Sequence, residues 1–355
     1  MGSDTSKVVD PWLLDSCKLA WHPGWLDKWF CGKPTYPIYV EIGLTNNCQH
    51  RCLFCSFDFT GYKNIKLKTS VIQQSLRDMA KAGVKAIMFA GEGEPFLHPQ
   101  IVEIADCAKR AGLDISITTN GHSATSDKLY QILPLLSWIK FSINGGTCIS
   151  HAKLHGTSEE SFDKVMENLE YAAKHKGTCT VGVQSVILPE HEQNIVELAW
   201  KVKSMGVDYY TIKPFTGHPL RELNQSPHYS RQEELFEKLD KLSMKDFHII
   251  IRQQAFQNLQ HNRDYTQCYG IDAMTYIAAT GDVYACSNFL GKQEYSYGNI
   301  NKQAFKEIWW GERRQAVRER IQRTKLADCR LICRLDPINQ YLWKMKNPPG
   351  HINFI

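Results

Sequence analysis

The stretch of sequence that decides the fold is "NNCQHRCLFCSFD", residues 46–58, in which Cys48, Cys52 and Cys55 follow the spacing C-x3-C-x2-C. Clustered cysteines in a chain with reduced thiols are typical of a metal site. Structural zinc and most iron–sulfur clusters take four protein ligands. Three thiolates in one loop therefore predict a metal centre with one open coordination position, where a substrate can bind. The alternative is zinc with a fourth ligand from elsewhere, such as His50 in the same loop.

The composition predicts a folded globular protein rather than a nucleic-acid-binding or membrane protein. The chain has 355 residues, 43% hydrophobic content and a net charge of +5, with basic residues scattered among acidic ones. We therefore expect one large domain with an appendage and no nucleic acid as the main partner. No apolar run approaches the length of a membrane span, and "MGSDTSKVVD" lacks a signal-peptide core, so we expect a cytoplasmic protein without disulfides.

From residue 37 onward, β-branched apolar runs alternate with amphipathic helical segments. The predicted strands are residues 37–45, 85–91, 114–121, 138–145, 180–188 and 208–215. The predicted helices are residues 69–83, 98–112, 126–136, 158–177, 194–206 and 231–242. Such alternation requires right-handed crossovers and a parallel sheet. The expected fold class is α/β, a partial (βα)6 TIM-like barrel.

Three parts of the chain differ in their pattern. Residues 37–252 form the predicted partial barrel. Residues 1–36 are rich in tryptophan and broken by proline, which favours a packed cap on the barrel over a flap that faces the substrate. Residues 253–355 hold four more cysteines and short strand-like runs, so we expect a separate small domain there.

The reactive groups of a (βα) barrel gather at the carboxyl ends of its strands. The cysteine triplet follows the first predicted strand, and "GEGEP", residues 91–95, follows the second. "TTNG", residues 118–121, and "SINGG", residues 142–146, end the third and fourth strands. We therefore expect these four segments to meet at one edge of the sheet.

This combination resembles the radical S-adenosylmethionine (SAM) superfamily over about residues 37–215. Phe54 precedes the third cysteine, as in the family's signature C-x3-C-x-aromatic-C. The resemblance implies that Cys48, Cys52 and Cys55 hold a 4Fe-4S cluster and that SAM occupies the open position. In this family the reduced cluster cleaves SAM to a 5′-deoxyadenosyl radical, which removes a hydrogen atom from a substrate carbon.

The resemblance also implies contacts with SAM. The family's "GGEP" motif aligns with residues 92–95, where Glu92 replaces the first glycine. Glu94 should accept from the SAM ammonium group, and Gly93 permits a close backbone approach. For Thr119 and Asn120 the ordinary Asn-Gly turn at the end of the third strand is an equally good explanation. The predicted cofactor-binding residues are Phe54, Gly93, Glu94, Asn120, Ser142, Asn144, Gln184 and Lys213.

The second set of cysteines is Cys268, Cys286, Cys329 and Cys333, in the spacings C-x12-G-x4-C and C-x3-C. Four thiolates can close a cluster fully, and a structural zinc site is the alternative. The sequence around these cysteines resembles the SPASM/Twitch iron–sulfur domains of radical SAM enzymes. Four cysteines fit the shorter Twitch form with one auxiliary 4Fe-4S cluster, a layout similar to that of aminocyclitol-oxidising members. If only one of Cys329 and Cys333 binds, the auxiliary cluster keeps an open iron.

Other residues have weaker signals. Cys148 lies near the expected radical site and is a candidate catalytic hydrogen-atom donor, as in radical SAM epimerases; a buried loop thiol is the alternative. His151 and His155 have i, i+4 spacing, but without a third ligand in the sequence we expect them to face solvent or substrate. Cys17, Cys31, Cys107 and Cys179 are expected to be structural thiols.

The expected substrate is a small molecule in a biosynthetic pathway: a sugar, an aminocyclitol or a nucleoside. Only about 36 residues precede the first strand, which is short for the peptide-recognition domain of many maturases, so a peptide substrate is the second choice. Arg221 and Arg252 are candidates for binding a charged substrate group. The expected outcome is oxidation or epimerisation, with a reductant such as flavodoxin or ferredoxin. A non-enzymatic zinc- or cluster-binding scaffold is the alternative of another class.

Overall fold

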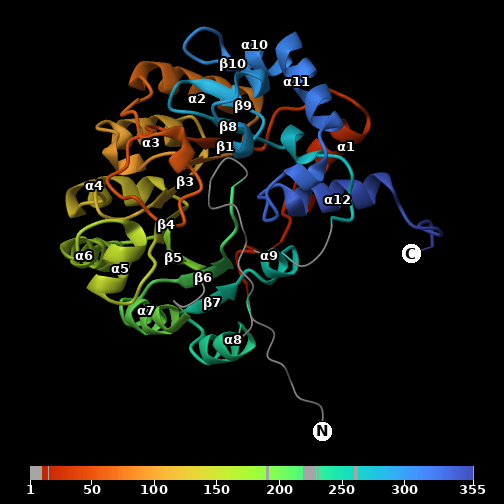
Figure 1. Cartoon of the computed structure of the whole chain (residues 1–355). Helices are drawn as coiled ribbons and strands as arrows, with labels where there is room; N and C mark the ends of the chain where they lie inside the picture. Colours follow the sequence, from red (N-terminus) through yellow and green to blue (C-terminus); the bar gives the residue numbers. More distant parts are fainter. Residues whose placement is uncertain are drawn as a thin grey trace.

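The computed structural model describes residues 10–14, 16–188, 192–218, 229, 232–259 and 263–354. Its strands form a single sheet in the order β10-β9-β8-β1-β2-β3-β4-β5-β6-β7. The strands are β1 Tyr39–Ile42, β2 Ala86–Phe89, β3 Asp114–Thr119, β4 Trp138–Ser142, β5 Thr180–Ile187, β6 Tyr209–Pro214, β7 His248–Ile251, β8 Met274–Ile277, β9 Asp282–Tyr284 and β10 Ser296–Asn299. In Figure 1 the parallel strands follow an arc with helices around its outer side.

Most helices cover the outer side of the sheet (Figure 1). Those of the barrel are α2 Thr69–Ala82, α3 Ile101–Arg110, α4 Ser126–Ile132, α5 Cys148–His155, α6 Glu160–Lys174, α7 Glu192–Ser204 and α8 Gln232–Asp240. The others are α1 Pro23–Phe30, α9 Gln253–Gln257, α10 Phe305–Trp310, α11 Glu312–Arg323 and α12 Asp336–Lys346. Within the part of the chain that the structure describes, none of the helices is long and apolar enough to cross a membrane.

The predicted strand–helix alternation is confirmed. Each of the six predicted strands forms and pairs in parallel with the next, from β1 to β6. A further parallel strand, β7, pairs with β6 and was missed by the sequence analysis. Helix α5 was also missed; it starts where Thr147 and Ser150 form a capping box. The α/β, partial-barrel fold class is therefore correct, with one more parallel strand than predicted.

The C-terminal segment continues the same sheet. Strand β8 pairs in parallel with β1, and β9 and β10 add antiparallel strands beyond it. The predicted boundary at residue 252 thus divides two parts that share one sheet. This pairing brings the second set of cysteines toward the loop that follows β1.

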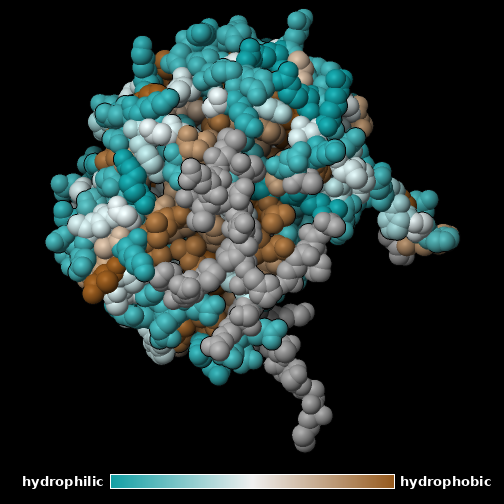
Figure 2. All heavy atoms as spheres, in the orientation of Figure 1, coloured by the Kyte–Doolittle hydropathy of each residue, from teal (hydrophilic) through white to brown (hydrophobic). Residues whose placement is uncertain are grey.

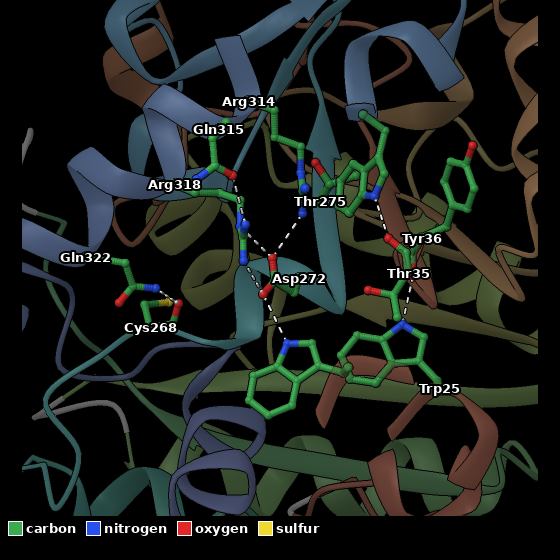
Figure 3. Close-up of polar contacts among 12 residues, drawn as sticks. Trp25, Thr35, Tyr36, Cys268, Asp272, Thr275, Arg314, Gln315, Arg318 and Gln322 are labelled. Atoms are coloured by element: carbon green, nitrogen blue, oxygen red, sulfur yellow. Dashed lines mark hydrogen bonds and ion pairs between the residues drawn. The ribbon is translucent and has the colours of Figure 1, made fainter. Parts of the chain in front are cut away.

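The N-terminal aromatic segment packs against the C-terminal part. The indole N–H of Trp29, in α1, donates to Asp272 at 3.1 Å. Arg314 and Arg318, from α11, donate to the two oxygens of the same carboxylate at 3.0 and 2.9 Å, and Figure 3 shows these groups converging on Asp272. Helix α1 is therefore anchored to the C-terminal part through the carboxylate of Asp272, and the cap on the barrel over residues 1–36 stays a prediction.

Candidate active site

The loop that carries the first cysteine triplet follows β1, as predicted. The amide of Asn120 donates to Cys48 Sγ at 3.6 Å. The backbone N–H of Phe57 and the hydroxyl of Tyr62 donate to Cys55 Sγ at 3.4 and 3.6 Å. Donors aimed at sulfur are what metal-bound thiolates need, because such hydrogen bonds orient the ligand and tune the metal.

The third thiol, Cys52, contacts a histidine of α5. Nδ1 of His155 lies 3.3 Å from Cys52 Sγ, and Nε2 of the same ring accepts the backbone N–H of Asn144 at 2.9 Å. The nitrogens of His50, His151 and His155 lie within 4.8 Å of one another, a spacing that a metal ion could use. Both nitrogens of His155 already have hydrogen-bond partners, Cys52 and the backbone of Asn144. We therefore assign this ring to the contact with Cys52 rather than to a metal ion. The expectation that His151 and His155 face solvent is wrong, since both are fully buried against the triplet loop.

The electrostatics of the triplet fit a bound cationic cluster. Burial, with the charges of Glu94 and Cys55, raises the pKa of Cys48 to about 12. Burial and the other two thiols raise the pKa of Cys52 well above its usual value. Three thiolates held this close repel one another unless a metal ion neutralises them. The donor set and its hydrogen bonds therefore suit a cluster at Cys48, Cys52 and Cys55, which stay the predicted ligands.

The "GEGEP" loop lies directly on the triplet loop. A Cβ at Gly93 would lie 2.2 Å from the carbonyl oxygen of Thr45 and 2.6 Å from that of Asn47. The next residue, Glu94, donates its backbone N–H to Asn47 O at 2.8 Å. The backbone at Gly93 therefore lies directly against the triplet loop, while its predicted contact with SAM stays a prediction.

The carboxylate of Glu94 organises the loops after β2 and β3. It accepts from Thr119 Oγ1 at 2.6 Å, Asn120 N at 2.7 Å and Phe96 N at 3.1 Å. Burial raises its pKa. Asn120 in turn donates to Cys48, so Glu94 and the triplet are joined through one residue. Whether Glu94 also accepts from the SAM ammonium group stays a prediction.

Glu92, where the family's motif has glycine, connects this loop to the C-terminal part. Its carboxylate accepts the backbone N–H of Ala279 at 2.5 Å. Its own backbone N–H donates to the hydroxyl of Tyr276 on β8 at 3.2 Å. Burial raises the pKa of Glu92 to about 7. Glu92, which stands where the motif has glycine, thus joins the loop after β2 to the segment around β8.

Three of the predicted cofactor-binding residues share the inner face of the sheet. On β4, Ile139 and Phe141 belong to the hydrophobic core, so the alternating residues Lys140 and Ser142 point to the other face. Ser142 pairs in register with Gln184 of β5, and Lys140 Nζ donates to Gln184 Oε1 at 2.9 Å. Lys213 of β6 alternates in the same way with the core residue Ile212.

The remaining predicted residues contact β5, α5 and α6. Asn144 exchanges hydrogen bonds with the backbone of Val186 on β5, at 3.3 and 3.1 Å. The Phe54 ring packs edge-on against His155, with ring centroids 5.2 Å apart. The Cys148 thiol donates to Asp163 of α6 at 3.6 Å. None of these contacts supports the hydrogen-donor role of Cys148, which stays a prediction.

The second set of cysteines forms one cluster of thiols. Burial and the charge of Cys333 raise the pKa of Cys268 to about 12, with a smaller contribution from Cys329. Burial and the charges of Cys333, Cys268 and Cys329 also raise the pKa of Cys286 well above its usual value. The amide of Asn339 donates to Cys268 Sγ at 3.5 Å. Cys329 contributes to the raised pKa of each of the other three thiols, so the four lie in one region; that all four are ligands stays a prediction.

The two sets of cysteines are joined by an arginine that the sequence analysis missed. Arg330, next to Cys329, donates to the hydroxyl of Ser56 at 2.9 Å, and Ser56 follows Cys55. The same segment carries Arg334, which donates to the carboxylate of Glu41 on β1 at 2.5 Å. The sequence signal that could have indicated such contacts is a charged residue within an apolar strand run, such as Glu41 or Lys140. Arg221 lies outside the described residues.

Known protein families account for both cysteine sets. The profile of the radical SAM superfamily matches residues 42–200, and that of the SPASM iron–sulfur cluster-binding domain matches residues 268–334. The chain therefore carries a radical SAM domain over residues 42–200 and a C-terminal SPASM domain over residues 268–334. Its cofactors are accordingly a 4Fe-4S cluster, an auxiliary iron–sulfur cluster and SAM.

Individual relatives are distant but span most of the chain. The tungsten-containing aldehyde ferredoxin oxidoreductase cofactor-modifying protein of Pyrococcus furiosus is 23% identical over 300 residues, covering 78% of this chain and 81% of its own. The AdoMet-dependent heme synthase of Methanosarcina barkeri is 22% identical over 296 residues, covering 77% and 82%. The crystal structure of Streptococcus suis SuiB bound to precursor peptide SuiA superposes with a TM-score of 0.68 at 15% identity, covering 87% and 73%, a likeness that shows the fold alone.

Proposed function

We propose that this radical SAM enzyme reductively cleaves SAM and removes a hydrogen atom from a small molecule bound at the inner face of the sheet. One observation carries the proposal. Three thiols in one loop, each with a hydrogen-bonding partner, lie against the "GEGEP" loop at the carboxyl ends of the strands. The polar residues of β4 to β6 occupy the neighbouring face.

The residues of the chain divide this task between them. Cys48, Cys52 and Cys55 would hold the SAM-binding cluster. When bound, the cluster and SAM would supply the radical chemistry: with one electron from a reductant such as flavodoxin or ferredoxin, SAM would be cleaved to methionine and a 5′-deoxyadenosyl group that would remove a hydrogen atom from a substrate C–H bond. An auxiliary cluster held by Cys268, Cys286, Cys329 and Cys333 would accept the second electron of an oxidation, and the hydrogen bond from Arg330 to Ser56 joins the two segments that carry the cysteine sets. Epimerisation is the other outcome we propose.

The choice of a small molecule over a peptide has support from the relatives that span the chain. Their names describe modification of a cofactor and synthesis of heme, both small-molecule reactions. The SuiB complex contains a precursor peptide. A peptide substrate is therefore the second candidate, and the experiment below separates the two.

The test is 5′-deoxyadenosine formation by the anaerobically reconstituted, reduced protein. We would compare SAM alone, SAM with a pool of small metabolites and SAM with a peptide pool. We expect stimulation by the metabolite pool, which can then be fractionated. Stimulation by peptides alone would show that the substrate is a peptide rather than a small molecule, while SAM cleavage and hydrogen-atom removal would still hold. Absence of SAM cleavage in protein with its full iron content would reject the proposed reaction.

A further inference from the structure

Arg51, between the first two cysteines of the triplet, is an exposed residue that is fastened to the loop carrying them. An exposed arginine alone is ordinary, because hydrophilic side chains cover most of the face drawn in Figure 2. The guanidinium of Arg51, however, donates to two backbone carbonyl oxygens of the triplet loop, Cys48 O at 2.5 Å and His50 O at 2.8 Å. Its positive charge is therefore held beside the predicted metal ligands.

The backbone of Arg51 is fixed by the end of α5. Its N–H donates to the carbonyl oxygen of His155 at 2.9 Å. A Cβ at Gly156 would lie 2.4 Å from the carbonyl oxygen of Arg51, so glycine is required for the two backbones to approach this closely. The side chain of Arg51 thus starts from a fixed point at the solvent edge of the triplet loop.

Tyr62 connects this arginine to a thiol of the triplet. The central carbon of the Arg51 guanidinium lies 3.9 Å from the centroid of the Tyr62 ring, a distance at which cation and ring attract each other. The hydroxyl of the same ring lies 3.6 Å from Cys55 Sγ. A thiolate has no proton to give, so the hydroxyl donates. The guanidinium, the ring and the thiol therefore form a continuous chain of contacts.

The backbone around Tyr62 is strained in the conformation that makes these contacts. Tyr62 has φ 39° and Asn64 has φ 54°. Asparagine tolerates the left-handed region, but a bulky aromatic residue there is an outlier and persists only where its surroundings fix it. The far end of this turn is tied down because the N–H of Ile65 donates to the side chain of Asn46 at 2.9 Å. The strain is thus retained where it sets the Tyr62 hydroxyl against Cys55.

We propose that Arg51 and Tyr62 are positioning residues that together raise the reduction potential of the SAM-binding cluster. The inference rests on the proposed function, which places this cluster at Cys48, Cys52 and Cys55. The potential of an iron–sulfur cluster depends on nearby charge and on hydrogen bonds to its sulfurs. Reduction adds one negative charge, so a hydroxyl that donates to a thiolate and a cation next to it both favour the reduced state.

The two residues act as one unit, which we call the Arg51–Tyr62 clamp. A cation over the face of an aromatic ring draws electron density toward itself, so the hydroxyl at the ring edge becomes a stronger donor. The redox step itself is a one-electron transfer. A reductant of the flavodoxin or ferredoxin class loses one electron, the cluster gains it, and no proton moves. By raising the potential, the clamp makes this transfer more favourable.

The experiment is a redox titration of the reconstituted holoenzyme, followed by electron paramagnetic resonance and run without SAM. A parallel sample with SAM identifies the SAM-binding cluster, because its signal changes when SAM binds. Tyr62→Phe keeps the ring and removes the donor. We expect the equilibrium constant for one-electron reduction to fall about tenfold, which is a potential lower by about 59 mV. Tyr130→Phe, which removes a hydroxyl from a residue of α4 that is 72% exposed, is the matched control and should leave the potential unchanged.

Variants of Arg51 test whether the clamp acts as a unit. Arg51→Gln removes the cation and should lower the equilibrium constant about threefold or more. In the Tyr62→Phe background the same substitution should have a smaller effect, because residues that act on one another are not additive. Arg51→Lys keeps the charge but lacks the planar fork, so it should restore only part of the potential.

Several outcomes overturn the inference. Equal potentials in Tyr62→Phe and Tyr130→Phe would reject the redox role, and full additivity of Tyr62→Phe and Arg51→Gln would reject the clamp. Loss of iron from Tyr62→Phe, with circular dichroism like that of the wild type, would assign Tyr62 a structural role alone. Each of these results leaves the proposed function standing. A wild type with its full iron content but no signal that responds to SAM would overturn the proposed function, and this inference with it.

Discussion

His155 Nδ1 lies 3.3 Å from Cys52 Sγ, and the other nitrogen of the ring accepts the backbone N–H of Asn144. A neutral imidazole has one donor and one acceptor nitrogen. Burial, with the charges of His151 and His50, lowers the pKa of His155 well below its usual value, so the ring is neutral. Its proton is therefore on Nδ1, and His155 donates an N–H···S hydrogen bond to a predicted cluster ligand.

Loss of this hydrogen bond should change the reduction potential of the SAM-binding cluster. A donor to the thiolate stabilises the reduced, more negative state. We expect His155→Phe to lower the potential by roughly 40–60 mV, the equivalent of about one hydrogen bond. A redox titration followed by electron paramagnetic resonance measures this shift. His122→Phe is the control, because its ring contacts Ser161 and no cysteine. An unchanged potential in His155→Phe would contradict the assignment.

Gly93→Ala should disturb the metal loop without a change in charge. The new Cβ would lie 2.2 Å from a carbonyl oxygen of the triplet loop, closer than any real contact, so the backbone must move. We expect weaker SAM binding and a loss of 5′-deoxyadenosine formation of at least about tenfold. Gly24→Ala is the matched control, because a Cβ there would meet nothing within 4 Å and alanine favours the helix. Equal activity of the two variants would show that the loop adapts.

The sequence was sufficient for the repeated part of the fold. Period-2 and period-3.6 patterns long enough to be distinguished predicted the strands from β1 to β6 and the helices between them. Strand β7, "HIII", was missed because so short an apolar run does not distinguish a strand from a helix. The four loops at the strand ends were placed together correctly, because parallel strands share one edge.

The contacts that complete the site could not be predicted from spacing. Arg334 meets Glu41 across 293 residues, and Arg330 meets Ser56 across 274. Such pairs form only because β8 adds to the sheet beside β1. The separate-domain interpretation of residues 253–355 overlooked this pairing, since a parallel partner strand has no local sequence signal.

Glu92 makes stability depend on pH. Its pKa rises on folding from about 4.5 to about 7, mainly through burial. Between these values the folded protein holds a proton that the unfolded chain has released, so stability falls as pH rises through this window and stays reduced above about 7. The linkage between protonation and folding limits this loss in the free energy of unfolding to on the order of 3 kcal/mol.

Glu92→Gln should therefore remove this pH dependence. We expect the free energy of unfolding at pH 8 to rise relative to the wild type, with little change at pH 4.5 to 5. The glutamine keeps an acceptor for the Ala279 N–H, so the fold is retained. Thermal unfolding midpoints at pH 5 and pH 8, measured anaerobically, test this. Glu103→Gln, on the exposed side of α3, should leave the pH dependence intact. A steeper pH dependence in Glu92→Gln would show that ionisation of Glu92 stabilises the folded protein, opposite to the expectation.

Asp272 should be the residue that holds the N-terminal segment and the second cysteine set in place. Its buried carboxylate pairs with Arg314 and Arg318 and accepts from Trp29, and it follows Cys268 by four positions. Asp272→Ala leaves the buried guanidinium of Arg314 unpaired, which costs about 3–5 kcal/mol. Trp29→Phe removes one hydrogen bond and retains most of the packing, so it costs about 1 kcal/mol.

We expect the denaturant midpoint to fall strongly in Asp272→Ala and slightly in Trp29→Phe. Iron content should fall in Asp272→Ala by the share of the auxiliary cluster, while the SAM-binding cluster is retained, because the triplet loop has its own hydrogen bonds. If both clusters were lost together, the two cysteine sets would form one folding unit joined through Arg330 and Ser56. If neither were lost, the Asp272 ion pairs would serve only to dock α1 against α11.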